Sequence, residues 1–190
     1  MSKNWKTPRE SIATVFKDND YGYAFHGGML FVEFLTASKL SAAKLKGQKI
    51  LDYGCGTGRV SRYLALTGAH VIGYDPTSEC IAEGLVVESK KVPPTSLTPK
   101  LLTSDLSQIG NNFDYAICIN VLDHLTNDDY MQAVSNITDS LREGGTAFLW
   151  VHKRTPLPLV DTELVRSNPT NTVIIKGTKV NGQIEYFQKC

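Results

Sequence analysis

The sequence predicts an α/β fold in which a doubly wound, mostly parallel sheet of seven strands ends in an antiparallel hairpin. From residue 49 onward, short apolar runs that suit buried strands alternate with amphipathic helical segments. A parallel sheet covered by helices on both faces produces that alternation. The turn Asn181-Gly182 separates the last two strand-like runs and is a strong hairpin signal. The chain as a whole is expected to form one compact domain.

Residues 1–47 are predicted to hold helices and an aromatic cover segment, followed by the sheet domain over residues 48–190. A short helix is expected over Pro8–Lys17 and a longer one over Met29–Lys46. Between them, Asp18–Gly28 is expected to be a loop that carries aromatic side chains among glycines. Two interpretations of this loop stay open: a hydrophobic contact that fastens the N-terminal helix to the sheet, or a cover over a bound ligand.

The alternating part of the chain is predicted element by element. Its strands are Lys49–Tyr53, His70–Asp75, Lys100–Thr103, Phe113–Asn120, Thr146–Val151, Thr172–Lys179 and Gln183–Gln188. Its helices are Gly58–Thr67, Ser78–Ser89 and Asn127–Arg142, with Leu141–Gly145 as a helix C-cap and turn. Prolines indicate loops over Lys90–Pro99 and Lys153–Asn171, and the second loop leaves room only for a short helix near Val160–Arg166.

Composition excludes several classes of function. The 20 basic and 19 acidic residues nearly balance, so no strong attraction to nucleic acid or to a membrane surface is expected. No apolar stretch approaches the roughly 20 residues that span a bilayer, and the N-terminus lacks the apolar segment of a signal peptide. The four cysteines form no C-x-x-C pair, which favours reduced thiols in a cytoplasmic protein over disulfides or a metal site.

The stretch Asp52-Tyr53-Gly54-Cys55-Gly56-Thr57-Gly58 joins the first predicted strand to its helix. Glycines allow tight turns there, and they let a ligand approach the main chain without meeting a Cβ. Open α/β sheets bind ligands at this carboxyl edge, where the Asp52 carboxylate would lie. The G-x-G-x-x-G fingerprint of dinucleotide-binding proteins fails, because its third glycine falls on Arg59 or Ser61.

Two acidic residues follow the next two strands. Asp75 comes 23 residues after Asp52, near the offset at which an acid meets ribose hydroxyls in nucleotide-binding units. A surface aspartate that caps the next helix, helped by Pro76, is the alternative. Asp105 follows the third strand and precedes Leu106, and an ordinary turn aspartate is the alternative there.

The Asp-x-Gly-x-Gly-x-Gly run resembles the first motif of class I S-adenosylmethionine-dependent methyltransferases, which have a Rossmann-like fold. The segment from Asn120 to Leu125 resembles the one after strand four in small-molecule methyltransferases of the ubiquinone-biosynthesis type. It lacks the Pro-Pro-aromatic sequence found in methyltransferases that act on amines of nucleic-acid bases. In this family the seventh strand is inserted antiparallel between the fifth and the sixth. Four segments in the family's order cover about residues 48 to 151.

The resemblance implies S-adenosylmethionine as cofactor, with Asp75 on the ribose, Asp105 on the adenine amino group and Leu106 on the adenine face. The implied cofactor-binding residues are Asp52, Gly54, Cys55, Gly56, Gly58, Asp75, Pro76, Asp105, Leu106, Asn120 and, from the aromatic segment, Tyr21. No metal is expected. His124 and His152 lie after strands four and five, where either could be a general base; a structural role is the alternative for both.

Three functions are compatible with these features. The first is methyl transfer to a small-molecule acceptor by in-line displacement, without nucleic acid or membrane and with self-association possible. The second is a cofactor-binding subunit without independent catalysis that needs a partner to complete the acceptor site; it is suggested by the irregular segment before the last hairpin and by the lack of the family's usual substrate-recognition insertion. The third, a nicotinamide-dependent oxidoreductase, is disfavoured by the glycine spacing.

Overall fold

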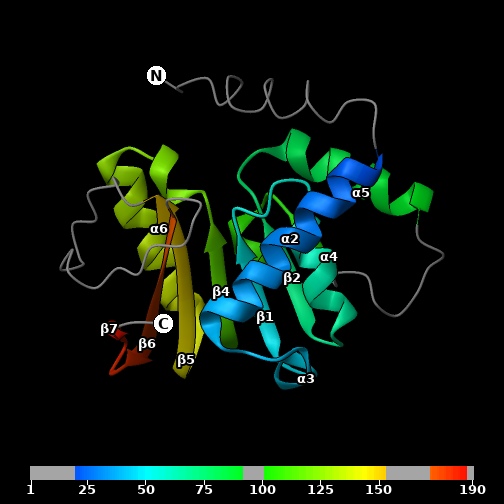
Figure 1. Ribbon diagram of the computed structural model, residues 1–190. Helices are drawn as coiled ribbons and strands as arrows, with labels where there is room; N and C mark the ends of the chain where they lie inside the picture. Colours follow the sequence, from blue (N-terminus) through cyan, green and yellow to red (C-terminus); the bar gives the residue numbers. More distant parts are fainter. Residues whose placement is uncertain (1–19, 92–100, 153–171, 188–190) are drawn as a thin grey trace.

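A seven-stranded sheet with the order β3-β2-β1-β4-β5-β6-β7 forms the centre of the computed structural model (Figure 1), which describes residues 20–91, 101–152 and 172–187. Its strands are β1 (Lys49–Tyr53), β2 (His70–Tyr74), β3 (Leu101–Thr103), β4 (Phe113–Ile119), β5 (Leu141–His152), β6 (Thr172–Val180) and β7 (Gln183–Phe187). The first five strands are parallel, and β6 is antiparallel to both β5 and β7. The predicted fold class is confirmed.

Helices cover both faces of the sheet. They are α2 (Asp20–Ser38), α3 (Ala42–Leu45), α4 (Arg59–Leu66), α5 (Ser78–Lys91) and α6 (Asn127–Ser140), with two 3₁₀ turns, η1 (Leu106–Gln108) and η2 (Leu122–His124). One core cluster joins α2 and α4 to the strands, and its aromatic centre is the edge-to-face pair of Phe34 and Phe148, 5.3 Å apart. In Figure 1, α2 lies in front of the sheet. No helix in the described ranges is long and apolar enough to span a bilayer.

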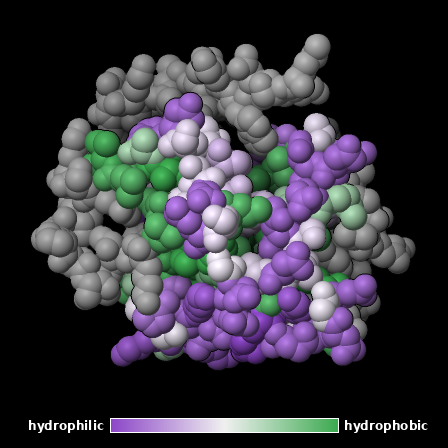
Figure 2. All heavy atoms as spheres, turned by 180° about the vertical axis from the view of Figure 1, so that it is seen from behind, coloured by the Kyte–Doolittle hydropathy of each residue, from purple (hydrophilic) through white to green (hydrophobic). Residues whose placement is uncertain are grey.

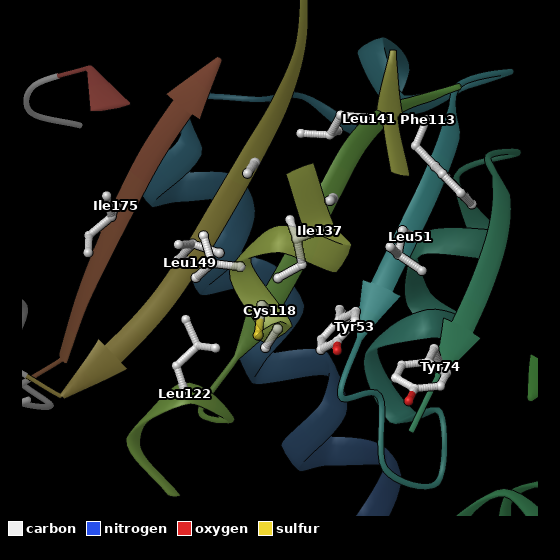
Figure 3. Packing of buried hydrophobic residues seen from close by; sticks show 14 of the residues in the cluster. Leu51, Tyr53, Tyr74, Phe113, Cys118, Leu122, Ile137, Leu141, Leu149 and Ile175 are labelled. Atoms are coloured by element: carbon white, nitrogen blue, oxygen red, sulfur yellow. The ribbon is translucent and has the colours of Figure 1, made fainter. Parts of the chain in front are cut away.

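The second core cluster lies between α6 and the other face of the sheet. Leu51, Cys118 and Leu149 project from three neighbouring strands toward Ile137 of α6 (Figure 3). Each of these side chains is almost fully buried. Because alternate strand residues enter opposite clusters, the strands appear in the sequence as continuous apolar runs, as expected for a sheet that is covered on both sides. Seen from behind, hydrophilic residues fill the lower edge of the molecule, and hydrophobic residues gather above it on the left and in the centre (Figure 2).

The predicted loop over Asp18–Gly28 is wrong, because α2 begins at Asp20. The two glycines that suggested a loop lie inside this helix, where α2 packs closely against α4. A Cβ at Gly27 would lie 3.1 Å from Cβ of Arg59, and a Cβ at Gly28 would lie 3.0 Å from the Tyr63 hydroxyl. A helix can accommodate glycine at a cost of about 1 kcal/mol each, and here the small residues permit the close approach.

The helix predicted over Met29–Lys46 is in fact interrupted. Lys39 has a positive φ of 55°, and Ser41 caps the short helix α3 by accepting a hydrogen bond from the Lys44 amide. Phe34 and Leu45 from this part of the chain enter the same core as α4 and the strands. The division at residues 47/48 stays a prediction. The expected helix over Pro8–Lys17, most of the Lys90–Pro99 loop, and the loop with its short helix near Val160–Arg166 lie outside the described residues.

The segment Leu141–Gly145 already belongs to β5, so its prediction as a turn is wrong. The predicted helix C-cap is present, because Leu141 caps α6 and its amide donates to the Thr138 carbonyl. Helix α6 ends at Ser140, and Leu141 already has extended backbone and pairs with Phe113 of β4. An ion pair between Arg142 and Asp114, 2.8 Å long, holds this start of the strand to β4. Gly145 is needed because a Cβ there would lie 2.8 Å from the Phe113 carbonyl oxygen. The register between β4 and β5 shifts at this point.

The C-terminal hairpin is confirmed, but its order in the sheet differs from the family's pattern. Asn181 and Gly182 have positive φ values of 51° and 78°, as a tight two-residue hairpin turn requires. Strand β6 pairs with β5 and β7 forms the edge, so the last strand is not inserted between its two predecessors. The longer β6 carries the buried Ile175 and suits the inner position, whereas β7 begins at the exposed Gln183.

The hairpin is fastened to α6 by Lys179, whose ammonium donates hydrogen bonds to the carbonyls of Thr138 (2.8 Å) and Leu141 (2.9 Å). These are carbonyls at the C-terminus of α6, where a cation is favoured by the helix dipole.

We expect Lys179→Met to lower the free energy of unfolding by about 1–2 kcal/mol, measured by urea denaturation. Lys176→Met on the same strand is the matched control and should have a smaller effect. Equal losses in the two variants would contradict the capping role.

Candidate functional site

The glycine turn between β1 and α4 is held in a conformation that only glycine adopts easily. Gly54, Gly56 and Gly58 have positive φ values of 77°, 57° and 79°. The amides of Gly54 and Cys55 both donate to the Tyr74 carbonyl at the end of β2, at 2.7 and 2.9 Å. The turn is therefore attached to the neighbouring strand through main-chain bonds, and the predicted strand–turn–helix unit is confirmed.

Asp75 links this turn to the start of the next helical segment. Its Oδ2 accepts a hydrogen bond from the Gly56 amide, and its Oδ1 accepts one from the Thr77 amide, both at 2.9 Å. Asp75 thus holds the turn before α5 through the Thr77 amide, one residue before the helix begins at Ser78. Each carboxylate oxygen has a second lone pair, so these bonds leave acceptor capacity for the hydroxyls of a ligand. Asp75 itself is partly exposed.

Asp52 lies at the end of β1 and is almost fully buried, with 3% of its surface exposed. Its Oδ2 accepts a hydrogen bond of 2.5 Å from the hydroxyl of Ser61, which is also buried. Burial raises the pKa of the Asp52 carboxyl group to about 6; the Ser61 hydrogen bond opposes this shift and the nearby Asp75 carboxylate adds to it. A carboxyl group of this kind can gain or lose a proton near neutrality.

The sequence analysis did not single out Ser61. The signal was present, because Ser61 is a polar residue on the buried face of an amphipathic helix, between Val60 and Leu64. A hydroxyl at such a position needs a buried hydrogen-bond partner. Nine residues upstream, Asp52 is the acceptor that the turn brings within reach.

The thiol of Cys55 lies within the turn but is a poor nucleophile. Burial raises its pKa well above the ordinary value, and the Asp52 and Asp75 carboxylates raise it further. A protonated thiol of this kind is inert. Cys55, Cys80 and Cys118 are free thiols. Within the described ranges, no group of three or more His, Cys, Asp or Glu side chains is arranged to hold a metal.

Asp105 and Leu106 follow β3 at the same edge of the sheet. Asp105 caps η1 by accepting hydrogen bonds from the amide and hydroxyl of Ser107, at 2.9 and 2.7 Å, and these bonds lower the pKa of its carboxyl group. The side chain of Leu106 is exposed. An exposed apolar side chain beside a hydrogen-bond acceptor is suited to a planar polar ring.

Asn120 combines two features that mark binding sites. It has a positive φ of 54° at the end of β4, which is uncommon for a residue with a Cβ. Its buried Oδ1 has no hydrogen-bond partner, although buried polar atoms nearly always have one. The next residue, Val121, packs against the glycine turn. Asn120 therefore presents a ready acceptor beside the turn.

The remaining predicted residues are less closely tied to the turn. His124 is the exposed last residue of η2, and Pro76 is exposed after β2. His152 is the last residue of β5 and Tyr21 lies in the first turn of α2. The side chains of His152 and Tyr21 lie outside the described part of the structure.

Comparisons with known proteins agree on one family. A family model described as a methyltransferase domain matches residues 50–145. A ubiquinone biosynthesis O-methyltransferase of Rhizobium johnstonii is 28% identical over 156 residues, which are 82% of this chain and 61% of the relative. A magnesium-protoporphyrin O-methyltransferase of Synechocystis is 30% identical over 106 residues, which are 56% of this chain and 46% of the relative. The chain thus spans about three fifths of the length of the first of these curated relatives.

A solved structure extends the comparison to three dimensions. Magnesium protoporphyrin IX methyltransferase from Synechocystis PCC 6803, crystallised with bound SAM, superposes with a TM-score of 0.62 at 21% identity. The match covers 86% of this chain and 82% of that protein. At this level of identity, the likeness establishes the shared fold.

The packing of the turn generates a stability prediction. A Cβ at Gly54 would lie 2.2 Å from Cγ2 of Val121, whereas a Cβ at Gly56 would meet no atom within 4 Å. We expect Gly54→Ala to lower the free energy of unfolding by about 3 kcal/mol, from overpacking added to left-handed strain. Gly56→Ala should cost only the strain, about 1 kcal/mol. Adding Val121→Ala to Gly54→Ala should restore part of the loss; urea denaturation that shows no such recovery would refute the clash.

Proposed function

Because this chain belongs to the methyltransferase-domain family, we propose that it transfers the methyl group of S-adenosylmethionine to a small-molecule acceptor by in-line displacement. The observation that carries the proposal is the glycine turn, in which the Gly56 backbone is fixed by Asp75 while the space beside its Cα stays open. A ligand can contact the main chain there. The family match and the shared fold support the same cofactor class.

The residues at the carboxyl edge of the sheet fit this cofactor. The free lone pairs of Asp75 suit a ribose diol, the exposed Leu106 suits an adenine face, and Asp105 suits the adenine amino group. The unpartnered Oδ1 of Asn120 suits a donor such as the methionyl ammonium. We assign cofactor contact to these residues and to the turn from Asp52 to Gly58. Pro76 would lie beside the ribose, and Tyr21 would belong to an aromatic segment that covers the cofactor.

The chemistry requires little of the protein beyond position. When bound, the cofactor supplies a methyl group already activated by its sulfonium. The chain orients the acceptor in line with that methyl group and excludes water, and such positioning lowers a barrier by up to roughly 7–11 kcal/mol. An acceptor that keeps its proton also needs a base. His124, in η2 after β4, and His152, the last residue of β5, are the proposed candidates, because both strands end at this edge.

The acceptor atom is proposed to be an oxygen on a small molecule. The relatives from Rhizobium johnstonii and Synechocystis are both named as O-methyltransferases. Residues Val121 and Leu122 stand where base-modifying methyltransferases carry prolines, so a nucleic-acid acceptor is disfavoured. The three thiols in the described part of the chain are free, which supports a reducing, cytoplasmic location.

The proposal is tested with the isolated chain. Calorimetric titration should show binding of S-adenosylmethionine and S-adenosylhomocysteine and none of NADH. Turnover is then measured by mass spectrometry with a panel of phenols, carboxylates and amines, and we expect methylation among the oxygen acceptors. Tight cofactor binding without any turnover would favour the cofactor-binding subunit instead. Binding of NADH alone would overturn the proposed function.

A matched pair of glycine substitutions tests the turn. Gly56 and Gly110 both have positive φ, and a Cβ at either position would meet no atom within 4 Å. Gly56→Ala and Gly110→Ala should therefore lose similar stability, about 1 kcal/mol. Only Gly56→Ala should weaken S-adenosylmethionine binding, by at least about tenfold, because its methyl group enters the ligand's space. Equal affinity in the two variants would remove Gly56 from the binding surface.

The ribose assignment is tested at Asp75. We expect Asp75→Ala to weaken S-adenosylmethionine binding by about 1.5–3 kcal/mol, the scale of hydrogen bonds to a charged group. Asp139→Ala, an exposed aspartate of α6, is the control and should bind normally. Melting temperatures of both variants separate binding from folding, because Asp75 also caps main-chain amides. Unchanged affinity by calorimetry would contradict the assignment.

A further inference from the structure

Asp52 is a buried carboxyl group, and its neighbours only partly stabilise the negative charge of its ionised form. Ser61 donates a hydroxyl hydrogen bond of 2.5 Å to Oδ2, and its backbone hydrogen bond also favours the charged form. Among the described residues, the charged group that shifts the pKa of Asp52 is Asp75, whose like charge raises it. A buried carboxylate beside a second carboxylate is costly unless a positive charge arrives. The carboxyl ends of β1 and β2 therefore form a site that is short of one positive charge.

The proposed cofactor and its product differ by that charge. At neutral pH, S-adenosylmethionine carries a sulfonium, an ammonium and a carboxylate, for a net charge of plus one. S-adenosylhomocysteine has lost the sulfonium and is neutral overall. A site that holds two carboxylates at the glycine turn should interact differently with the two molecules, since opposite charges attract strongly where water is excluded.

The groups that face Asp52 from neighbouring elements define what can titrate. They are Ser61 on α4, Asp75 after β2, Cys55 in the turn and Cys118 on β4. Burial raises the pKa of both thiols, so they stay neutral below about pH 8. The Asp75 carboxylate accepts two amide hydrogen bonds. Burial raises the pKa of Asp52 to about 6, so this carboxyl group exchanges a proton near neutrality.

We propose that Asp52 couples cofactor binding to proton release: the positive cofactor expels the carboxyl proton of Asp52 to solvent, whereas the neutral product leaves that proton largely in place. The step is a simple exchange, in which the protonated carboxyl group and the cation become a carboxylate–cation pair plus one free proton. It rests on the proposed function, since S-adenosylmethionine must bind at this turn. Ser61 is the positioning residue that sets the pH at which the exchange occurs.

The direction of the pH dependence follows from linkage. The free protein binds the Asp52 proton below about pH 6, and the cofactor-bound protein does not, so binding releases a proton in that range. Affinity for S-adenosylmethionine should therefore fall by up to about tenfold for each pH unit below 6. Affinity for S-adenosylhomocysteine should fall less, so the preference for the methyl donor over its product weakens in acid.

The experiment is isothermal titration calorimetry of the full chain with each ligand between about pH 5 and pH 8. Repeating each titration in buffers of different ionisation enthalpy gives the number of protons released on binding. We expect release with S-adenosylmethionine below pH 6 that fades toward pH 8, and clearly less release with S-adenosylhomocysteine. Equal release with both ligands would overturn the charge discrimination.

Two variants and a control separate this role from a structural one. Asp52→Asn is neutral and similar in shape, so its affinity should no longer depend on pH in this range. Ser61→Ala removes a hydrogen bond that favours the charged form, so proton release should extend to higher pH than in the native protein. Ser140→Ala removes another buried serine hydroxyl, which donates 2.7 Å to the Ile137 carbonyl of α6, and should leave the pH profile unchanged.

The outcomes distinguish the two proposals. S-adenosylmethionine that binds without proton release, or a Ser61→Ala profile identical to the native one, would overturn the role of Asp52 and leave the proposed function standing. Failure of S-adenosylmethionine to bind at any pH would overturn the proposed function and this inference together.

Discussion

The attachment of the glycine turn to the end of β2 is the interaction on which the rest of the site depends. Two amides of the turn share the Tyr74 carbonyl, and a third donates to the Asp75 carboxylate. These bonds fix the left-handed backbone that glycine alone tolerates well. They also fix the direction in which α4 leaves the turn, and through Ser61 the orientation of the buried Asp52. Cofactor contact, charge and helix packing thus share one main-chain arrangement.

Helix packing on both faces of the sheet stabilises the strands that carry this turn. On one face, α2 and α4 pack over β1, β4 and β5 around the Phe34–Phe148 pair. On the other face, α6 covers the same strands, and the Tyr53 hydroxyl near the carboxyl edge accepts a hydrogen bond of 3.1 Å from Asn136. The two tyrosines at the ends of β1 and β2 lie against each other, 5.0 Å apart (Figure 3). The carboxyl edge is therefore rigid beneath the residues that face a ligand.

The sequence predicts the elements that rest on local pattern and fails where distant contacts decide. Strand β1, the turn and the Asn181-Gly182 hairpin follow from apolar runs and glycine chemistry, and the structure has all of them. Gly27 and Gly28 suggested a loop, because the close approach of α4 that makes glycine useful in a helix is invisible in the sequence. The sequence predicts the start of β5 at Thr146 instead of Leu141, since the pairing of Leu141 with Phe113 across 28 positions is equally invisible. In the site, the spacing of the glycines and acidic residues is sufficient to predict them. The unpartnered Oδ1 of Asn120 and the hydrogen bond from Ser61 to Asp52 depend on the three-dimensional arrangement, so the sequence does not predict them.

The glycine contact between α2 and α4 has a mechanical consequence. Gly27 sits against Arg59, the first residue of α4 and the immediate neighbour of the turn. No side chain at Gly27 cushions the approach, and packed protein interiors are nearly incompressible. A tilt of α2 would therefore pass almost undiminished into the first turn of α4. A displacement of α2, which carries the N-terminal aromatic residues, would therefore also displace the glycine turn, and the reverse holds as well.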